Sequence, residues 1–220
     1  MVTWFDFSHH FDKTMPVPDW PDVERQEFTL KTFFLELNGG TQNYLSMNLH
    51  SGTHLDAPSH FVQGGKSIDQ IDFTDLMGEC SVIDLNKGSL EPVTVSDLRS
   101  HEERTRGKKI IFLRTGWEDK WGTKAYESEY PFLANETAPY LIGLGIKIIG
   151  LDTPGPDAPL RSPFRKGSPL HKELLSNGVL IIENLTNLSD AVSYDLFVHA
   201  YPISIKGATG SPARVIARVI

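Results

Sequence analysis

Hydrophobic residues occur mostly in short runs along the chain, and this pattern predicts more strands than helices. Residues 27–37 alternate in part between apolar and polar positions and are rich in aromatic side chains, which favours a strand. Short continuous apolar runs are typical of strands that are covered on both faces. We predict strands at residues 27–37, 80–85, 109–113, 146–151, 179–185, 200–205 and 213–220.

Helices are fewer, and the residues at their ends identify them. The clearest candidate has Pro169 at its first helical position, Ser168 available as a cap, and Gly178 just beyond its end. Another candidate takes Ser96 as its N-terminal cap. We predict helices at residues 96–101, 136–144 and 169–176.

The order of these elements predicts a mixed α+β fold. Strands outnumber helices and alternate with them only in part, so a strictly doubly wound parallel sheet is not expected. Pro and Gly are scattered rather than gathered into a linker, and no repeat divides the sequence. We therefore predict a single domain that spans residues 1–220.

The composition is that of an ordinary globular protein and argues against two classes of partner. Of the 220 residues, 40% are hydrophobic and 22% are charged, so the chain can build a buried core. The net charge of −7 argues against a general affinity for nucleic acid or for an anionic membrane.

Cysteine usage and the N-terminal segment bear on the cellular compartment. The single cysteine, Cys80, cannot form an internal disulfide, which indicates a reducing compartment. The N-terminal segment has no basic stretch followed by a long apolar run, so a signal peptide is not predicted. No apolar stretch is long enough to cross a bilayer. The sequence thus predicts a cytoplasmic protein.

The segment HSGTHLDAPSHF, residues 50–61, gathers side chains that can bind metals. A helix would not converge them, because residues advance by about 100° each and the glycine and proline of the segment oppose a helix. In an extended chain, alternate residues point to the same side, and the four polar groups all lie at even positions. These groups are His50, His54, Asp56 and His60.

Imidazole and carboxylate groups at this spacing indicate part of a metal site. Both are standard ligands of zinc and of neighbouring transition metals. The alternative is a polar turn with incidental histidines, which a single histidine would favour. Three histidines and an aspartate within eleven residues favour a metal site instead.

A second stretch, residues 168–188, offers further ligands. Glu183 interrupts an apolar run, and a buried carboxylate without a partner is costly, so Glu183 should pair with a cation or bind a metal. The alternative is an edge strand with Glu183 facing solvent. His171, on the preceding helix, would by itself more often be a surface residue. A turn at Asn177 and Gly178 could fold the strand back along the helix and bring the two side chains together.

Three further charged residues lie at or near the ends of predicted strands. Asp152 could orient a metal-binding histidine from behind, or it could cap a turn. Arg114 and Arg214 could each meet a substrate carboxylate, but we favour pairing with a carboxylate of the fold itself.

The chain resembles the cyclase-like family of metal hydrolases, which includes bacterial kynurenine formamidases and isatin hydrolases. Residues 50–60, HSGTHLDAPSH, match the family signature H-x-G-T-H-x-D-x-P-x-H at every fixed position. His171 and Glu183 match the family's pattern of a histidine followed by a glutamate twelve residues later. Further matches, at residues 6–8, Trp20, 150–153 and 207–214, extend the resemblance over nearly the whole chain.

This resemblance implies a role for each candidate residue. It implies one metal ion held by His50, His54, Asp56 and Glu183. It implies a second ion held by Asp56, His171 and Glu183, with the two carboxylates bridging. His60 would stay off the metal as the catalytic acid/base, and Trp20 would line the substrate pocket. The implied cofactor is a pair of zinc ions per subunit, with manganese as the alternative.

The fold and the assembly that the resemblance implies are also specific. The fold would be a single-domain β/β/α layered sandwich. The partners would be a small-molecule substrate and further copies of the chain, in a homodimer or a tetramer, with no nucleic acid and no membrane.

The reaction implied is hydrolysis of an amide-type C–N bond. An arylformamidase of this kind converts N-formylkynurenine to kynurenine and formate in tryptophan catabolism. The metal ions would lower the pKa of a water nucleophile toward neutrality. His60, with an ordinary histidine pKa of about 6.5, could take up a proton and deliver it to the departing amine.

Two alternatives remain at this point. One is an isatin-hydrolase-like enzyme that opens a cyclic amide or a lactone with the same metals. The other is a non-catalytic protein that binds a metal or a ligand on the same scaffold. His60 argues against the second, because a purely structural site needs no additional histidine beside its ligands.

Overall fold

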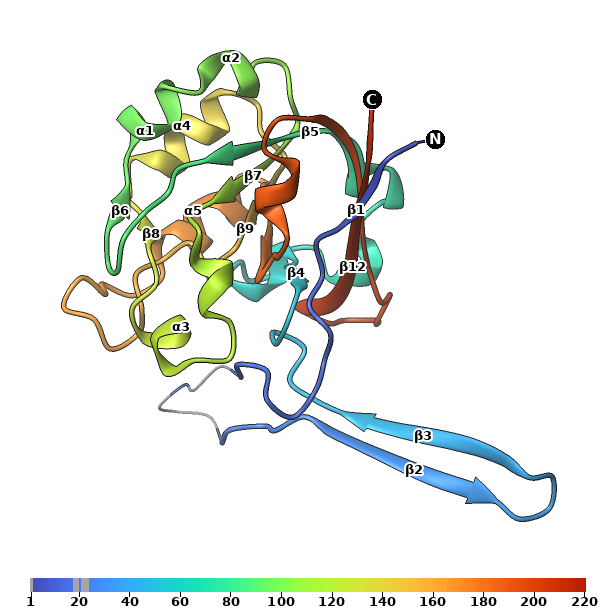
Figure 1. Ribbon diagram of the computed structural model, residues 1–220. Helices are drawn as coiled ribbons and strands as arrows, with labels where there is room; N and C mark the ends of the chain where they lie inside the picture. Colours follow the sequence, from blue (N-terminus) through green and yellow to red (C-terminus); the bar gives the residue numbers. More distant parts are fainter. Residues whose placement is uncertain (1, 18–19, 21–23) are drawn as a thin grey trace.

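Most strands of the computed structural model, which describes residues 2–17, 20 and 24–220, join in one sheet (Figure 1). Among the described residues this sheet has eight strands, in the order β1-β12-β11-β5-β7-β9-β10-β4, and β4 also pairs with β12. The additional pairing closes the sheet into a barrel-like ring. The strands are β1 (Trp4–Asp6), β4 (His54–Asp56), β5 (Met77–Asp84), β7 (Ile110–Arg114), β9 (Ile148–Leu151), β10 (Leu180–Glu183), β11 (Asp195–Pro202) and β12 (Gly210–Val219).

The four central strands are parallel and buried on both faces. β5 pairs with β7, β7 with β9, and β9 with β10, all in parallel. Alternate residues point to opposite faces, so Ile110 and Phe112 enter the core inside the ring. Ile111 and Leu113 enter a second core outside it. The continuous apolar runs therefore reflect two cores, one on each face.

Helices cover the outer face of these parallel strands. The second core takes its helical side chains from α1 (Val95–Arg99), α4 (Thr137–Gly143) and α5 (Pro169–Ser176). Two shorter helices are α2 (Glu102–Thr105) and α3 (Lys124–Ser128), and a small sheet pairs β6 (Pro92–Val93) with β8 (Phe132–Leu133). Turns of 3₁₀ helix lie at η1 (Pro58–His60), η2 (Ile68–Gln70), η3 (Phe73–Leu76), η4 (Trp117–Lys120) and η5 (Leu188–Ala191). Among the described helices, none combines the length and apolar character needed to cross a membrane.

A two-stranded ribbon projects from this body (Figure 1). It consists of β2 (Thr29–Leu35) and β3 (Gly40–Ser46), which pair antiparallel along their whole length. The turn between them places Gly39 at a φ of +71°, a conformation that favours glycine. We refer to residues 29–46 as the arm.

The predicted mixture of strands and few helices is confirmed, with corrections at particular elements. The strand predicted at 200–205 is β11, which begins earlier, at Asp195, because it pairs with both β5 and β12. The predicted cap Ser96 is wrong: Thr94 accepts from the backbone N–H of Asp97 and begins the helix. The single domain over residues 1–220 and the β/β/α layering stay predictions.

Candidate metal centre

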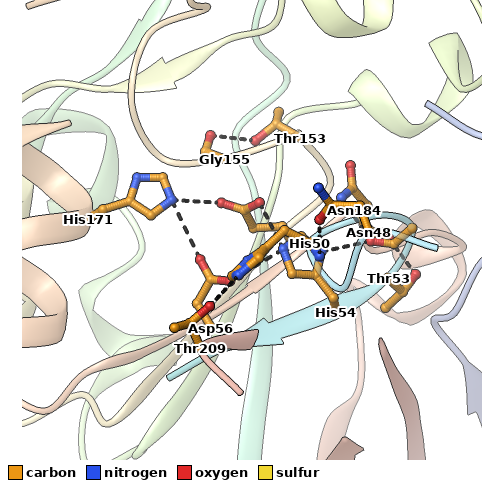
Figure 2. A network of polar contacts seen from close by, with 12 residues as sticks. Asn48, His50, Thr53, His54, Asp56, Thr153, Gly155, His171, Asn184 and Thr209 are labelled. Atoms are coloured by element: carbon orange, nitrogen blue, oxygen red, sulfur yellow. Dashed lines mark hydrogen bonds and ion pairs between the residues drawn. The ribbon is translucent and has the colours of Figure 1, made fainter. Parts of the chain in front are cut away.

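Strand pairing brings one imidazole and two carboxylate side chains to one side of the closed sheet (Figure 2). β4 and β10 run antiparallel, and Glu183 stands directly opposite His54. Leu55, between His54 and Asp56, points into the core inside the ring. Because alternate residues of a strand point to opposite faces, His54, Asp56 and Glu183 all face outward, and all three are buried.

His50 reaches this cluster from a turn rather than from a strand. β4 contains only three residues, because Gly52 takes a φ of +64° before it and the helical turn η1 follows it. The extended geometry predicted for the motif is therefore wrong at its start, where Gly52 turns the chain. The motif still converges, since Nδ1 of His50 lies 2.8 Å from Oδ1 of Asp56 and its Nε2 lies 3.0 Å from the Thr209 hydroxyl.

Helix α5 adds another imidazole to the cluster. Nε2 of His171 lies 3.0 Å from Oε1 of Glu183 and 3.6 Å from Oδ2 of Asp56. Nε2 of His54 lies 3.3 Å from Oδ1 of Asp56 and 3.3 Å from Oε2 of Glu183. The predicted return of the strand along the helix thus brings His171 and Glu183 together, and each carboxylate contacts more than one imidazole.

Two buried atoms of the cluster lack a hydrogen-bond partner. Nε2 of His54 and Oδ2 of Asp56 are shielded from solvent and make no hydrogen bond with any described residue. An unsatisfied buried polar atom costs about 1–3 kcal/mol. One donor atom each from His54, Asp56 and Glu183 lie within 4.8 Å of one another, and the same holds for His50, Asp56 and His60. A divalent cation would satisfy the unpaired atoms, so these residues fit a metal ion.

The carboxylates hold protons on two of the imidazoles. Burial lowers the pKa of His54, but the carboxylates of Asp56 and Glu183, each 3.3 Å from its Nε2, outweigh burial and raise the pKa to about 10. Burial acts in the same way on His171, whose pKa is raised to about 10 by Asp157 and Glu183. A metal ion that binds these nitrogens must displace the protons, because only the neutral imidazole is a ligand.

Two glycines allow the backbone to approach the cluster closely. A Cβ on Gly210 would lie 2.3 Å from Cε1 of His50, and a Cβ on Gly155 would lie 2.9 Å from Oε1 of Glu183. Both separations are too short for any real side chain. The space beside the two side chains therefore exists only because these positions are glycine.

His60 lies beside the cluster at the end of η1. Its ring stacks on that of His50, with the centroids 4.0 Å apart, and its centroid lies 5.9 Å from that of His171. Burial lowers the pKa of His60 to about 4. The ring is therefore neutral near pH 7. None of the described residues forms a hydrogen bond with its ring nitrogens.

Asp157 contacts His171, and sequence analysis did not identify it as a candidate. Its carboxylate, 2% exposed, accepts from the backbone N–H groups of Leu170 and His171, and its Oδ2 lies 2.5 Å from Nδ1 of His171. Asp157 thereby caps α5 and orients His171. Ser168 occupies the predicted cap position but makes no side-chain cap bond, because its hydroxyl accepts from Arg165 instead. Asp157 lies on a loop well before α5, and no fixed spacing in the sequence relates such a carboxylate to the helix that it caps.

A similar set of contacts orients His54 (Figure 2). Nδ1 of His54 lies 2.9 Å from the carbonyl oxygen of Gly52, which also accepts from the Asn184 amide at 2.9 Å. The hydroxyl of Tyr126 donates to the side-chain oxygen of Asn184 at 2.9 Å. These contacts turn Nε2 of His54 toward the two carboxylates.

The other charged candidates have structural partners. Asp152 accepts the backbone N–H groups of residues 115–117, so of its two predicted roles the structure favours the cap of a turn. Arg114 and Arg214 each pair with a carboxylate of the fold, as predicted.

Trp20 makes its contact away from the cluster. Its side chain is 40% exposed, and the Arg165 guanidinium lies 5.7 Å from the centre of its ring. Within the described ranges it forms no ring contact with the histidines of the cluster. Its predicted place in a substrate pocket remains a prediction.

Comparisons with known proteins cover nearly the whole chain. A family model described as putative cyclase matches residues 5–158. The kynurenine formamidase of Geobacillus thermodenitrificans is 31% identical over 221 residues, which cover 99% of this chain and 98% of that protein.

Solved structures agree with this chain over the same length. Isatin hydrolase A from Ralstonia solanacearum has a TM-score of 0.87 at 25% identity, and the match covers 100% of this chain and 92% of that one. A predicted metal-dependent hydrolase from Bacillus stearothermophilus has a TM-score of 0.79 at 29% identity, with 99% and 98% covered. The matched lengths include both the motif at residues 50–60 and the segment with His171 and Glu183.

Proposed function

This chain belongs to the putative cyclase family, and on that basis we propose that it is a metal-dependent hydrolase that cleaves an amide-type C–N bond. The observation that carries the proposal is the buried cluster in which two carboxylates contact three imidazoles around unpaired buried atoms. The unpaired buried atoms are costly as they stand, and a donor set of imidazoles and carboxylates suits a divalent metal.

We assign the metal ligands to the residues of this cluster, namely His50, His54, Asp56, His171 and Glu183. The proposed cofactor is a pair of zinc ions, with manganese as the alternative. Each carboxylate contacts more than one imidazole, an arrangement compatible with bridging two ions. A divalent cation bound here supplies a lowered pKa for a water molecule and polarisation of the substrate carbonyl.

His60 is proposed to move the proton. Its neutral ring lies beside His50 and has no competing hydrogen bond within the described residues, so it can accept a proton from the attacking water. It can then return that proton to the nitrogen of the departing amine, which is a poor leaving group unless it is protonated.

Three contacts with their other ring nitrogens position the proposed histidine ligands. Asp157 holds Nδ1 of His171, the Gly52 carbonyl lies against Nδ1 of His54, and Thr209 contacts His50. Contacts of this kind fix which ring nitrogen faces the metal.

The substrate we favour is an N-formyl arylamine such as N-formylkynurenine, with formate and the free amine as products. The kynurenine formamidase relative supports this choice. The structural match to isatin hydrolase A favours a second candidate, a cyclic amide or lactone opened by the same groups. Trp20 is proposed as an aromatic wall for either flat substrate. A cytoplasmic location, a homo-oligomer and β/β/α layering complete the proposal.

The test is metal content together with hydrolysis of N-formylkynurenine and of isatin by the purified protein. About two equivalents of metal with release of formate would support the arylformamidase, and metal with opening of isatin would support the second candidate. A protein that binds metal but turns over neither substrate would favour the non-catalytic alternative. A protein that binds no metal after reconstitution would contradict the proposal.

Replacing Gly210 by alanine is expected to weaken metal binding. The added Cβ would overlap the His50 ring, so the ring must leave its contact with Asp56. We expect metal affinity to fall by about 10–100-fold, the range for disturbing the support of a ligand. Gly143→Ala is the matched control, because its Cβ would meet nothing within 4 Å and its φ is not positive. Competition with a chelator measures the affinity, and equal affinities of the two variants would contradict this expectation.

Replacing Asp157 by asparagine is expected to weaken metal binding by about 10–100-fold with little change in fold. The amide can still accept a backbone N–H of α5 through its oxygen, but it lacks the negative charge that holds Nδ1 of His171. Asp97→Asn is a matched control, since Asp97 caps α1 without a histidine partner. Metal affinity and the melting temperature of the metal-free protein separate the two roles. A loss of stability at unchanged affinity would mean that Asp157 only caps the helix.

A further inference from the structure

A cavity of about 310 Å³ lies between β8, the loop that precedes α5 and the first turn of that helix. Its lining comes from residues 132–135, from six residues between 157 and 167, and from Pro169 and Leu170. Among the described residues, the lining includes none of the proposed metal ligands and not His60, so the cavity is separate from the candidate metal centre. Its volume lies at the lower end of the range of roughly 300–1,000 Å³ that is usual for small-molecule sites.

Hydrogen bonds fix the walls of this cavity. The guanidinium of Arg165 donates from Nη1 to the carbonyl oxygen of Ala158 at 2.7 Å and from Nη2 to the hydroxyl of Ser168 at 2.6 Å. These two bonds tie the ends of the loop together. On the opposite wall the backbone N–H of Leu133 donates to the carbonyl oxygen of Pro156 at 2.8 Å. The cavity is therefore preformed, and a ligand that enters it does not have to order the loop.

Two phenylalanine rings form an apolar part of the wall. Phe132 and Phe164 both line the cavity, with their ring centroids 5.6 Å apart and an angle of 33° between the ring planes. Neither ring belongs to the two cores of the fold, and Phe164 is 53% exposed. A flat aromatic ligand that packs against this pair covers apolar surface that the chain itself leaves open.

The charge of the loop favours an anionic ligand. Residues 158–168 contain three cations, Arg161, Arg165 and Lys166, and no acidic residue, although the whole chain has a net charge of −7. Lys166 lines the cavity, is exposed, and forms no ion pair within the described ranges of the chain. Its ammonium group can therefore receive a carboxylate.

The acidic side chain in the described lining, that of Asp157, does not compete for Lys166. Its carboxylate accepts from the backbone N–H groups of Leu170 and His171, and its Oδ2 lies 2.5 Å from Nδ1 of His171. The negative charge of Asp157 is thus satisfied within the protein, and the positive charge of Lys166 is left for a ligand.

We propose that this cavity binds a small aromatic carboxylic acid, with its ring against Phe132 and Phe164 and its carboxylate on Lys166. An apolar cavity of about 150 Å³ accepts a benzene ring, so about twice that volume holds a substituted benzoate. An aliphatic anion would leave the two rings uncovered, and the cations of the loop would repel an aromatic cation. The inference does not rest on the proposed hydrolase activity, because the described lining contains no proposed metal ligand.

The test is a titration of the purified full chain with para-fluorobenzoate, followed by fluorine nuclear magnetic resonance. We expect saturable binding of this probe. Binding should be at least about tenfold weaker for para-fluoroaniline, which lacks the carboxylate, and for trifluoroacetate, which lacks the ring. The titration is repeated after treatment with a chelator, because a carboxylate can also bind a metal ion. Binding that disappears with the metal would place the probe at the candidate metal centre and overturn the proposal.

Two variants locate the bound probe. Lys166→Met removes the charge and keeps most of the length of the side chain, and we expect the affinity to fall by about fivefold or more. Phe164→Ala removes one ring from the wall and should weaken binding by about tenfold. The matched controls are Lys172→Met and Phe73→Ala, which alter an exposed lysine and an exposed phenylalanine outside the lining and should bind the probe as the wild type does.

The variants should fold, because both replaced side chains of the cavity are exposed, and far-UV circular dichroism checks that they do. Folded Lys166→Met and Phe164→Ala proteins that bind the probe like the wild type would contradict the proposal. A wild type without saturable binding at millimolar concentrations of the probe would contradict it as well.

Discussion

Asp56→Ala is expected to abolish metal binding and hydrolysis together. Asp56 is completely buried and contacts the imidazoles of His50, His54 and His171, so its loss affects every part of the cluster. We expect both metal affinity and kcat/KM to fall by more than about 100-fold, beyond the range for residues that only support a ligand. Metal analysis after dialysis and release of formate from N-formylkynurenine measure the two effects.

The control for this variant is Asp75→Ala, which removes an exposed carboxylate on η3. That variant should keep its metal and its activity, since its side chain lies outside the cluster. Circular dichroism must show that Asp56→Ala is folded. Retention of metal and turnover by a folded Asp56→Ala protein would mean that the metal centre lies elsewhere.

His60→Ala is expected to keep its metal and to lose turnover by about 10²–10⁴-fold, the usual contribution of a general acid–base group. His60 lies beside the cluster but forms none of the ion pairs between imidazole and carboxylate that define it. The loss should appear in kcat. It should be smaller for an aryl formate ester, because a phenolate can leave without being protonated.

Another outcome of this variant would change the assignment of His60. One of its nitrogens lies within 4.8 Å of donor atoms of His50 and Asp56, so the geometry also admits His60 as a ligand. Loss of metal from His60→Ala would establish that role and leave the acid/base group unassigned. His10→Ala, an exposed histidine, is the control that should change neither property.

The fold could be predicted where local pattern and tertiary burial agree. Residues 110–113 of β7 and 148–151 of β9 carry no polar side chain because one core lies on each side of them. β3 was missed because its sequence, GTQNYLS, has no apolar period, and pairing with β2 alone holds it extended. β1 and β4, with three residues each, are too short for any period to appear.

The same distinction applies to the candidate site. Spacing within residues 50–60 and the helix–turn–strand order before Glu183 were enough to predict which side chains meet. Asp157 could not be predicted in this way, because its contact with His171 depends on the path of a loop and on no repeating pattern. The turn at Gly52 was missed for a related reason, since the Phe11 ring, from a distant part of the sequence, lies where a Cβ at this position would stand.

The short strand β4 has a consequence for how the protein unfolds. It pairs with β10 on one side and β12 on the other, so its three residues join the two ends of the ring. Two of those residues, His54 and Asp56, face Glu183 across one of the joints. A metal ion held by these groups would cross-link β4 to β10 at the point where the sheet closes into a ring. Because a ligand that binds only the folded state stabilises it, chelation should lower the cooperative melting temperature of the whole protein.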